Sequence, residues 1–220
     1  MLVDDATERQ RSRRGERCLA GLSGFALPLF RSVSAMTWKT IRLADCPATA
    51  WRNGGGTTRE LVAWPTPGQW RWRMSVATIA ANGPFSGFDG ITRWFAVLSG
   101  AGVRLNIDGA SRSLTPFDVP ISFDGGATTT CELIDGATQD FNLMVSAELH
   151  SRVVRVTDRT TTALTSPTTI AVYTIDPTEV SVAGRSTFSV EPGMLAWCQV
   201  DAASHVSVVS THALWLEINE

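Results

Sequence analysis

Residues 70–79 alternate between large apolar side chains and polar or small ones. Tryptophan, methionine and valine occupy one parity, and arginine, serine and alanine occupy the other. Because successive side chains of a strand point to opposite faces, this pattern predicts a β-strand with one buried face. An apolar run at 94–98 and a second alternating segment at 103–107 follow. The glycines between these two segments and the Asp108-Gly109 pair after them predict two successive hairpins.

The strand pattern continues to the C-terminus, with glycine, proline and aspartate between the apolar segments. The further candidate strands are residues 119–123, 128–134, 141–145, 169–175, 186–190, 195–200, 205–209 and 213–218. Many short strands separated by turn residues favour an all-β sandwich or barrel. Two segments are candidate boundaries between two β units: the turn at 124–126 and the threonine-rich run at 157–169, which is the more linker-like.

Residues 1–35 are unlike the rest of the chain. Arginines interspersed with acidic residues precede an uncharged stretch at 18–30. This order is similar to that of a secretory signal peptide, but glycines and a proline interrupt the apolar part. We expect a disordered extension, or a mis-assigned start with Met36 as the true first residue, and export or other targeting remains an alternative. The sequence contains no apolar run long enough to predict a transmembrane helix.

Composition excludes several classes of protein. The 220 residues are 44% hydrophobic and 18% charged, with a formal net charge of -2, which is typical of a globular cytoplasmic protein without a nucleic-acid or membrane partner. The four cysteines are widely spaced and form no Cys-x-x-Cys pair, which argues against a zinc ribbon or a dithiol redox site. His205 and His212 would point opposite ways on one strand, so we expect no metal site.

The most unusual segment is residues 51–60, Trp-Arg-Asn-Gly-Gly-Gly-Thr-Thr-Arg-Glu. The amides of Gly54–Gly56 could form a concave anion-binding nest, Arg59 could hold a carboxylate, and Asn53 could orient it. The alternative is an ordinary glycine turn that leads into a strand, with Arg59 paired on the surface. If residues 57–62 are extended, Arg59 and Glu60 point to opposite faces, so only one of them can face a given cavity.

Two further segments carry candidate polar groups. Residues 83–93 contain Ser86, Phe88 and Arg93 in a glycine-rich loop, which would either wall a pocket or simply be anchored in the core by its phenylalanines. Asp140-Phe141-Asn142 either contributes to the same pocket or forms a turn that enters a strand.

Four motifs together resemble the HutD/Ves family. These are the glycine segment at 51–60, Trp72-Arg73-Met74-Ser75-Val76-Ala77, the Gly-Pro-Phe-Ser-Gly-Phe-Asp-Gly loop at 83–90, and Asp-Phe-Asn-Leu-Met at 140–144. Arg52 stands where the family usually has lysine, Ala50 where proline is usual, and Thr92 where aspartate is common. The loss of that carboxylate argues against acid–base chemistry in the 83–93 loop.

The resemblance implies a bicupin fold: two small cupin-like β-barrels, which we place at residues 36–124 and 125–220, with strands exchanged between them. It also implies no metal and no cofactor, and a regulatory role in histidine utilisation or stress response. A small anionic metabolite such as urocanate, N-formylglutamate or formiminoglutamate is the expected partner, and a homodimer is a further expectation.

The leading hypothesis is therefore a non-catalytic metabolite-binding protein. Its candidate ligand-binding residues are Asn53, Gly54, Gly55, Gly56, Thr57, Arg59, Ser86, Phe88, Arg93 and Asn142. The alternatives are a metal-independent hydrolase or isomerase with Glu60 or Asp140 as the general base, and a purely protein-binding module.

Overall fold

The computed structural model describes residues 37–202 and 204–219. The extension expected at residues 1–35 lies outside them. The described part of the chain folds into strands β1 to β19, with a single 3₁₀ turn, η1 (Leu43–Asp45), and no α-helix. The predicted all-β class is confirmed. None of the helical structure in these residues has the length and apolar character needed to cross a membrane.

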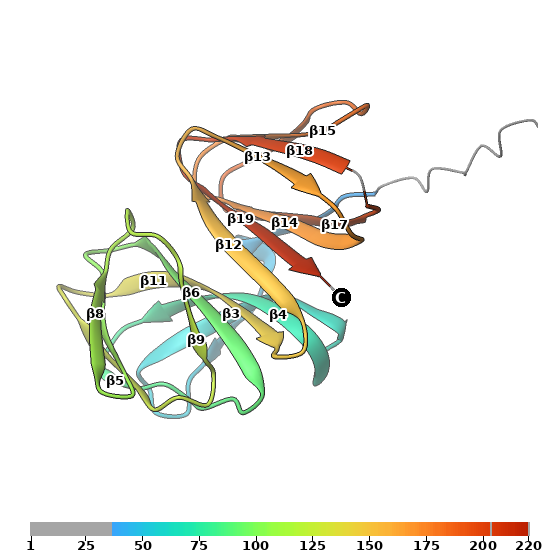
Figure 1. The fold of residues 1–220 in the computed structure, drawn as a ribbon. Helices are drawn as coiled ribbons and strands as arrows, with labels where there is room; N and C mark the ends of the chain where they lie inside the picture. Colours follow the sequence, from blue (N-terminus) through green and yellow to red (C-terminus); the bar gives the residue numbers. More distant parts are fainter. Residues whose placement is uncertain (1–36, 203, 220) are drawn as a thin grey trace, which may run out of the picture. The chain divides into compact units, whose positions relative to one another are not determined.

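The strands form four sheets (Figure 1), of which two make up the first lobe. Sheet I has the order β5-β10-β7-β8, and sheet II has the order β2-β3-β4-β11-β6-β9. The strands of sheet I are β5 (Gly83–Pro84), β7 (Val103–Ile107), β8 (Ala110–Leu114) and β10 (Thr129–Leu133). Those of sheet II are β2 (Ala48–Ala50), β3 (Gly56–Thr66), β4 (Gln69–Ile79), β6 (Ile91–Ser99), β9 (Ile121–Asp124) and β11 (Thr138–Ser146).

Sheets III and IV make up the second lobe, with the orders β1-β17-β14-β19-β12 and β13-β18-β15-β16. The strands of sheet III are β1 (Lys39–Arg42), β12 (His150–Val156), β14 (Thr168–Thr174), β17 (Met194–Val200) and β19 (Ala213–Asn219). Those of sheet IV are β13 (Arg159–Leu164), β15 (Thr178–Val182), β16 (Phe188–Val190) and β18 (Ser204–Val209). All pairings within the four sheets are antiparallel.

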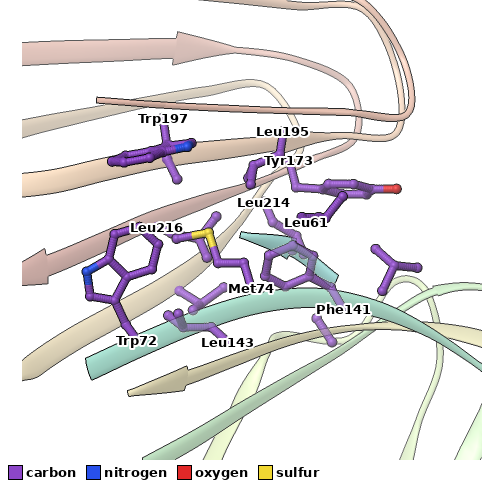
Figure 2. Close-up of a cluster of buried hydrophobic side chains, with 14 of the residues drawn as sticks. Leu61, Trp72, Met74, Phe141, Leu143, Tyr173, Leu195, Trp197, Leu214 and Leu216 are labelled. Atoms are coloured by element: carbon purple, nitrogen blue, oxygen red, sulfur yellow. The ribbon is translucent and has the colours of Figure 1, made fainter. Parts of the chain in front are cut away.

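Three apolar clusters fill the spaces between successive sheets. One lies between sheets I and II and includes Phe95 and Leu105, and another lies between sheets III and IV and includes Trp215. The third joins sheet II to sheet III, and Figure 2 shows its side chains. There the rings of Trp72 and Trp197 meet edge to face, with centroids 5.3 Å apart. Sheet II therefore has an apolar cluster on each face, and only part of one face remains for a polar site.

Strand β4 illustrates how sheet II is built. Trp72, Met74 and Val76 pack toward sheet III, as the alternation predicts. The opposite parity, however, does not face solvent: Ser75 and Ala77 are buried as well. The small and polar side chains of that parity face the interior of the first lobe. The strand at 70–79 was predicted correctly, but the prediction of a single buried face was wrong.

Two other expectations also need correction. The strand that ends at Ser99 does not form a hairpin with the strand that begins at Val103, because β6 pairs with β9 and β11 while β7 pairs with β8 and β10. Gly102 allows this change of sheet, since its φ is +104° and a Cβ there would lie 2.2 Å from the Leu114 carbonyl oxygen. The hairpin between β7 and β8 is confirmed. The threonine-rich run contains strand β13 rather than a linker.

Candidate functional site

A cleft of about 910 Å³ opens on the interior face of sheet II, beside the apolar cluster of the first lobe. Strands β3, β4, β6 and β11 provide its floor, and the segments around β2 and β5 provide its walls. The lining residues are Pro47, Thr49, Ala50, Trp51, Arg52, Asn53, Thr58, Glu60, Arg73, Ser75, Ala77, Pro84, Phe85, Ser86, Phe88, Arg93, Asn142 and Met144.

Arg93 on β6 is the most buried charged group of this lining, with 8% of its surface exposed. Its Nε donates a hydrogen bond of 2.8 Å to Asn142 Oδ1. Its guanidinium carbon lies 4.4 Å from the centroid of the Phe85 ring. Burial lowers the pKa of Arg93 to about 10, against the opposing effect of Asp140, so the side chain is still a cation at neutral pH. Its two Nη atoms have no hydrogen-bond partner among the described residues.

Asn142 and Asp140 lie on β11 with the same parity, so both side chains point to the face that carries Arg93. Asn142 Nδ2 donates to Asp140 Oδ2, which leaves Asn142 Oδ1 to accept from Arg93. Asp140 is 1% exposed, and its Oδ1 is buried without a hydrogen-bond partner. Burial raises the pKa of Asp140 to about 7, although Arg93 and the Asn142 hydrogen bond act in the opposite direction.

The rim of the cleft is more exposed and carries both signs of charge. Arg73 Nε lies 3.5 Å from Glu60 Oε2, with 20% of the arginine side chain and 43% of the glutamate side chain exposed. Arg52, also exposed, has no partner in the described part of the chain. The lining therefore contains three arginines and a single carboxylate, that of Glu60. This balance favours an anion in the cleft.

An aromatic wall faces this polar floor. Trp51 and Phe85 meet edge to face at 6.3 Å, and Trp51 Nε1 donates a 2.7 Å hydrogen bond to Thr58 Oγ1. Phe85 in turn packs against the buried Phe95 ring, with centroids 6.0 Å apart. These contacts connect the wall to the core of the first lobe, so the Arg93 guanidinium lies over a ring that is held in place.

Five of the ten ligand-binding candidates line the cleft: Asn53, Ser86, Phe88, Arg93 and Asn142. Arg59 and Glu60 point to opposite faces of β3, as expected for an extended segment, and only one of them faces the cleft. Glu60 lines the cleft, whereas Arg59 Nη1 donates to the Cys46 carbonyl oxygen instead. Thr57 shares the parity of Arg59 and is likewise absent from the lining.

The glycine segment has a different role from an anion nest in this geometry. Gly54 N donates to the Trp51 carbonyl oxygen at 3.0 Å, and Gly55 N donates to Asn53 Oδ1 at 3.0 Å, so both amides serve the turn itself. A Cβ on Gly56 would lie 2.3 Å from the Thr78 carbonyl oxygen. Close approach of β3 to β4 therefore explains Gly56. None of Gly54, Gly55 and Gly56 lines the cleft.

Sequence reasoning did not assign Arg73, Ser75 and Met144 to the site. Arg73 and Ser75 belong to the parity of β4 that was expected to face solvent. Their position opposite Arg93 depends on register: Met144 on β11 is paired with Arg73 on β4 and with Arg93 on β6. Pairing between strands so distant in the sequence leaves no local signal.

The described residues contain no group of three or more His, Cys, Asp and Glu side chains that could hold a metal ion. The cleft lining has neither histidine nor cysteine. What the arrangement offers chemically is a buried cation with free donors, an aromatic wall and neutral hydrogen-bonding groups.

Comparison with known proteins places this fold and its motifs in one family. Residues 43–216 match the family model described as HutD. An uncharacterised 21.2 kDa protein in the region 3′ of hutC in Pseudomonas putida is 38% identical over 149 residues, covering 66% of this chain and 78% of that protein. Protein Ves of Cronobacter sakazakii is 38% identical over 117 residues, which cover 53% of this chain and 65% of Ves, slightly less than two thirds of its length.

Solved structures agree. HutD from Pseudomonas fluorescens SBW25 superposes with a TM-score of 0.70 at 31% identity, covering 83% of this chain and 98% of that one. A variant of oxalate decarboxylase from Bacillus subtilis gives a TM-score of 0.54 at 11% identity over 82% of this chain and 76% of that chain. The second likeness concerns the fold alone, which is cupin-like. The family model spans most of the described chain, and the chain belongs to the HutD family.

Proposed function

We propose that this protein binds a small anionic metabolite in the cleft of the first lobe and that it does so without catalysis. The observation that carries the proposal is the free side of Arg93: its Nε is fixed by Asn142, while both Nη atoms have no partner in the described structure. A guanidinium held in this way presents two parallel donors, the geometry that a carboxylate matches.

The surroundings of Arg93 support a ligand of this charge. Burial weakens competition from water, so a charge-assisted hydrogen bond here contributes more than one at an exposed arginine, on the order of 1.5–3 kcal/mol. The aromatic wall of Trp51 and Phe85, together with the lining residue Phe88, offers an apolar surface for the ligand's carbon skeleton. Asn53 and Ser86 supply neutral hydrogen-bonding groups at the rim.

We further propose a regulatory role, with an intermediate of histidine degradation as the ligand. The relative in the hutC region of Pseudomonas putida motivates this choice. The candidates are urocanate, N-formylglutamate and formiminoglutamate, each of which carries at least one carboxylate. A cytoplasmic location, a homodimer, and the absence of nucleic-acid and membrane partners belong to the same proposal.

A second candidate function has one observation in its favour. The raised pKa of Asp140, about 7 because of burial, is typical of a general base. Against it, Asp140 does not line the cleft, and Glu60 is exposed and paired with Arg73. The enzyme alternative requires turnover of one of the candidate metabolites that is lost in Asp140→Asn or Glu60→Gln, as NMR of the reaction mixture would show.

Calorimetry and thermal shift with the three candidate metabolites test the binding proposal on the full chain. We expect a stabilising shift with at least one of them, because a ligand at about 100 times its Kd adds roughly 2.7 kcal/mol. Arg93→Met should weaken that binding by about 10- to 150-fold, the equivalent of roughly 1.5–3 kcal/mol. Arg104→Met is the matched control, since Arg104 is an exposed arginine of the same lobe that pairs with Glu132. Equal binding by both variants would sink the proposal.

We also propose that the two lobes are two cupin-like barrels that exchange strands across the 36–124 and 125–220 division. Two pairings support this: β10 and β11 pair with strands of the first lobe, and β1 pairs with β17 of the second. Limited proteolysis should then yield fragments that stay associated after cleavage between the lobes, whereas their separation under native conditions would contradict the exchange.

A further inference from the structure

Asp140 is a buried carboxyl group beside the cleft that the proposed function leaves without a task. It lies beneath Asn142, and it is connected to Arg93 through two hydrogen bonds: Asn142 Nδ2 to Asp140 Oδ2, and Arg93 Nε to Asn142 Oδ1. The amide in the middle can serve both neighbours in only one orientation. Asp140 therefore fixes Asn142, and Asn142 fixes the guanidinium.

Two titratable groups interact with Asp140: Arg93 on β6 and Cys131 on β10. Arg73 on β4 and Glu60 on β3 are the other charged groups of the facing strands, and both line the cleft. Burial, followed by the charge of Asp140, raises the pKa of Cys131 to about 12, so this thiol stays protonated near neutral pH. Arg93 is the dominant charge acting on Asp140, and it favours the ionised carboxylate.

An anion bound at Arg93 changes that balance. The ligand carboxylate and the Asp140 carboxylate would then share one buried guanidinium, and like charges in a poorly solvated site repel strongly. Asp140 Oδ1 has no hydrogen-bond donor to offset the added negative charge. A proton taken from solvent removes the repulsion and leaves the neutral hydrogen-bonding frame in place.

We propose that Asp140 is a positioning residue that couples anion binding to proton uptake: as a carboxylate docks on Arg93, the buried Asp140 carboxylate accepts a proton. This inference rests on the proposed function, because it concerns the same cleft. The raised pKa of Asp140, about 7, supports it by placing the protonation change near neutral pH. By linkage, affinity for the anion falls as pH rises, by up to about tenfold per pH unit for one coupled proton.

The test uses N-formylglutamate as the probe, because its own carboxyls remain ionised between pH 5.5 and 8.5. Titration calorimetry of the unaltered full chain in two buffers of different ionisation enthalpy measures the protons taken up per ligand. We expect a positive value of up to about one, together with a Kd that rises with pH. This measurement does not depend on whether any variant folds.

Three variants then assign the proton. In Asp140→Asn the Kd should become independent of pH, and proton uptake should vanish. Glu60→Gln should keep the pH dependence, which separates the buried carboxylate from the rim carboxylate. Glu132→Gln, an exposed carboxylate paired with Arg104, is the control for general charge effects and should keep it too.

Two results overturn the inference while the proposed function stands: a pH-independent Kd without proton uptake in the unaltered protein, or the same pH dependence in Asp140→Asn as in the unaltered protein. Absence of N-formylglutamate binding at every pH, with urocanate and formiminoglutamate also failing to bind, overturns the proposed function and this inference together.

Discussion

The two lobes are built from similar antiparallel sheets, but their interiors are filled differently. In the second lobe, strands β14, β17 and β19 turn alanine, valine, cysteine and tryptophan side chains toward sheet IV, and these fill the interior. In the first lobe, the corresponding space is filled only partly, and polar side chains of β4, β6 and β11 line a cleft of about 910 Å³. Among the described residues, the second lobe has an apolar interior and the candidate site lies in the first lobe.

The buried carboxylates of the two lobes differ in the same way. Glu217 accepts a 2.7 Å hydrogen bond from Trp215 Nε1 and a 3.2 Å hydrogen bond from Arg152, so one of its oxygens has two donors. Asp140 has only Asn142 on one oxygen and no partner on the other. The buried oxygen of Glu217 has its hydrogen-bonding capacity filled, whereas Asp140 retains a buried oxygen that can take up a proton.

We expect the largest loss of stability from a substitution in the apolar interior of the second lobe. Trp215 is 1% exposed, so Trp215→Ala should lower the free energy of unfolding by about 3–5 kcal/mol through lost burial and a cavity. Urea denaturation followed by tryptophan fluorescence measures this loss. In molecules that remain folded, carboxylate binding should be unchanged. A loss below about 1 kcal/mol would show that Trp215 is packed less tightly than its burial indicates.

The next largest effect is on the pH dependence of stability, and it comes from Asp140 in the first lobe. The pKa of Asp140 is about 7 in the folded protein against an ordinary value of 3.8. Between these values the folded state holds a proton that the unfolded chain has lost, so Asp140 makes stability fall as pH rises from about 4 to about 7. The stability of Asp140→Asn relative to the unaltered protein should therefore rise across this window, by on the order of a few kcal/mol. Thermal melts at several pH values measure it, and a flat difference would contradict it.

We expect a smaller loss of stability when alanine replaces a tightly packed glycine of the first lobe, and almost none when it replaces a glycine with free space around it. Gly56→Ala should destabilise by about 1–3 kcal/mol, because the new Cβ would meet the Thr78 carbonyl oxygen at 2.3 Å. Gly87→Ala is the matched control: its nearest neighbour is the Gly125 carbonyl oxygen at 4.0 Å, and we expect a change within about 0.5 kcal/mol. Chemical denaturation of both variants measures the contrast, and equal effects would argue against tight packing of β3 on β4.

The smallest effect compares two ion pairs. Glu217→Leu leaves the buried Trp215 Nε1 without its acceptor, which should cost about 1–3 kcal/mol. Glu60→Leu breaks a pair whose glutamate side chain is 43% exposed, and we expect a loss of less than about 1 kcal/mol. If the rim substitution proved the more costly in denaturation, Glu60 would have a structural role that its exposure does not indicate.

Local patterns predicted the all-β class and most strand positions, because alternation and turn residues act over a few positions. They also predicted that Glu60 and Arg59 face opposite ways. Of the residues that line the candidate site, Arg93 and Asn142 were named from the sequence. Arg73 was assigned to the correct face of its strand, but that face was expected to meet solvent rather than a cleft. A polar parity faces solvent in a single sheet but an interior cleft in a stack of sheets, and no nearby residue distinguishes the two cases.

The position of strand β1 in sheet III affects the order in which the strands can pair during synthesis. Lys39 on β1 is paired with Trp197 on β17, and its Nζ lies 4.3 Å from the centroid of that ring. The segment that becomes the edge of sheet III is therefore synthesised before any other strand of that sheet, and it must wait until most of the protein has left the ribosome. The strands of the first lobe follow β1 in the sequence and end at Ser146, so they are synthesised before every other strand of the second lobe. Nascent chains stalled before β17 should consequently expose β1 as an unpaired edge open to chaperones.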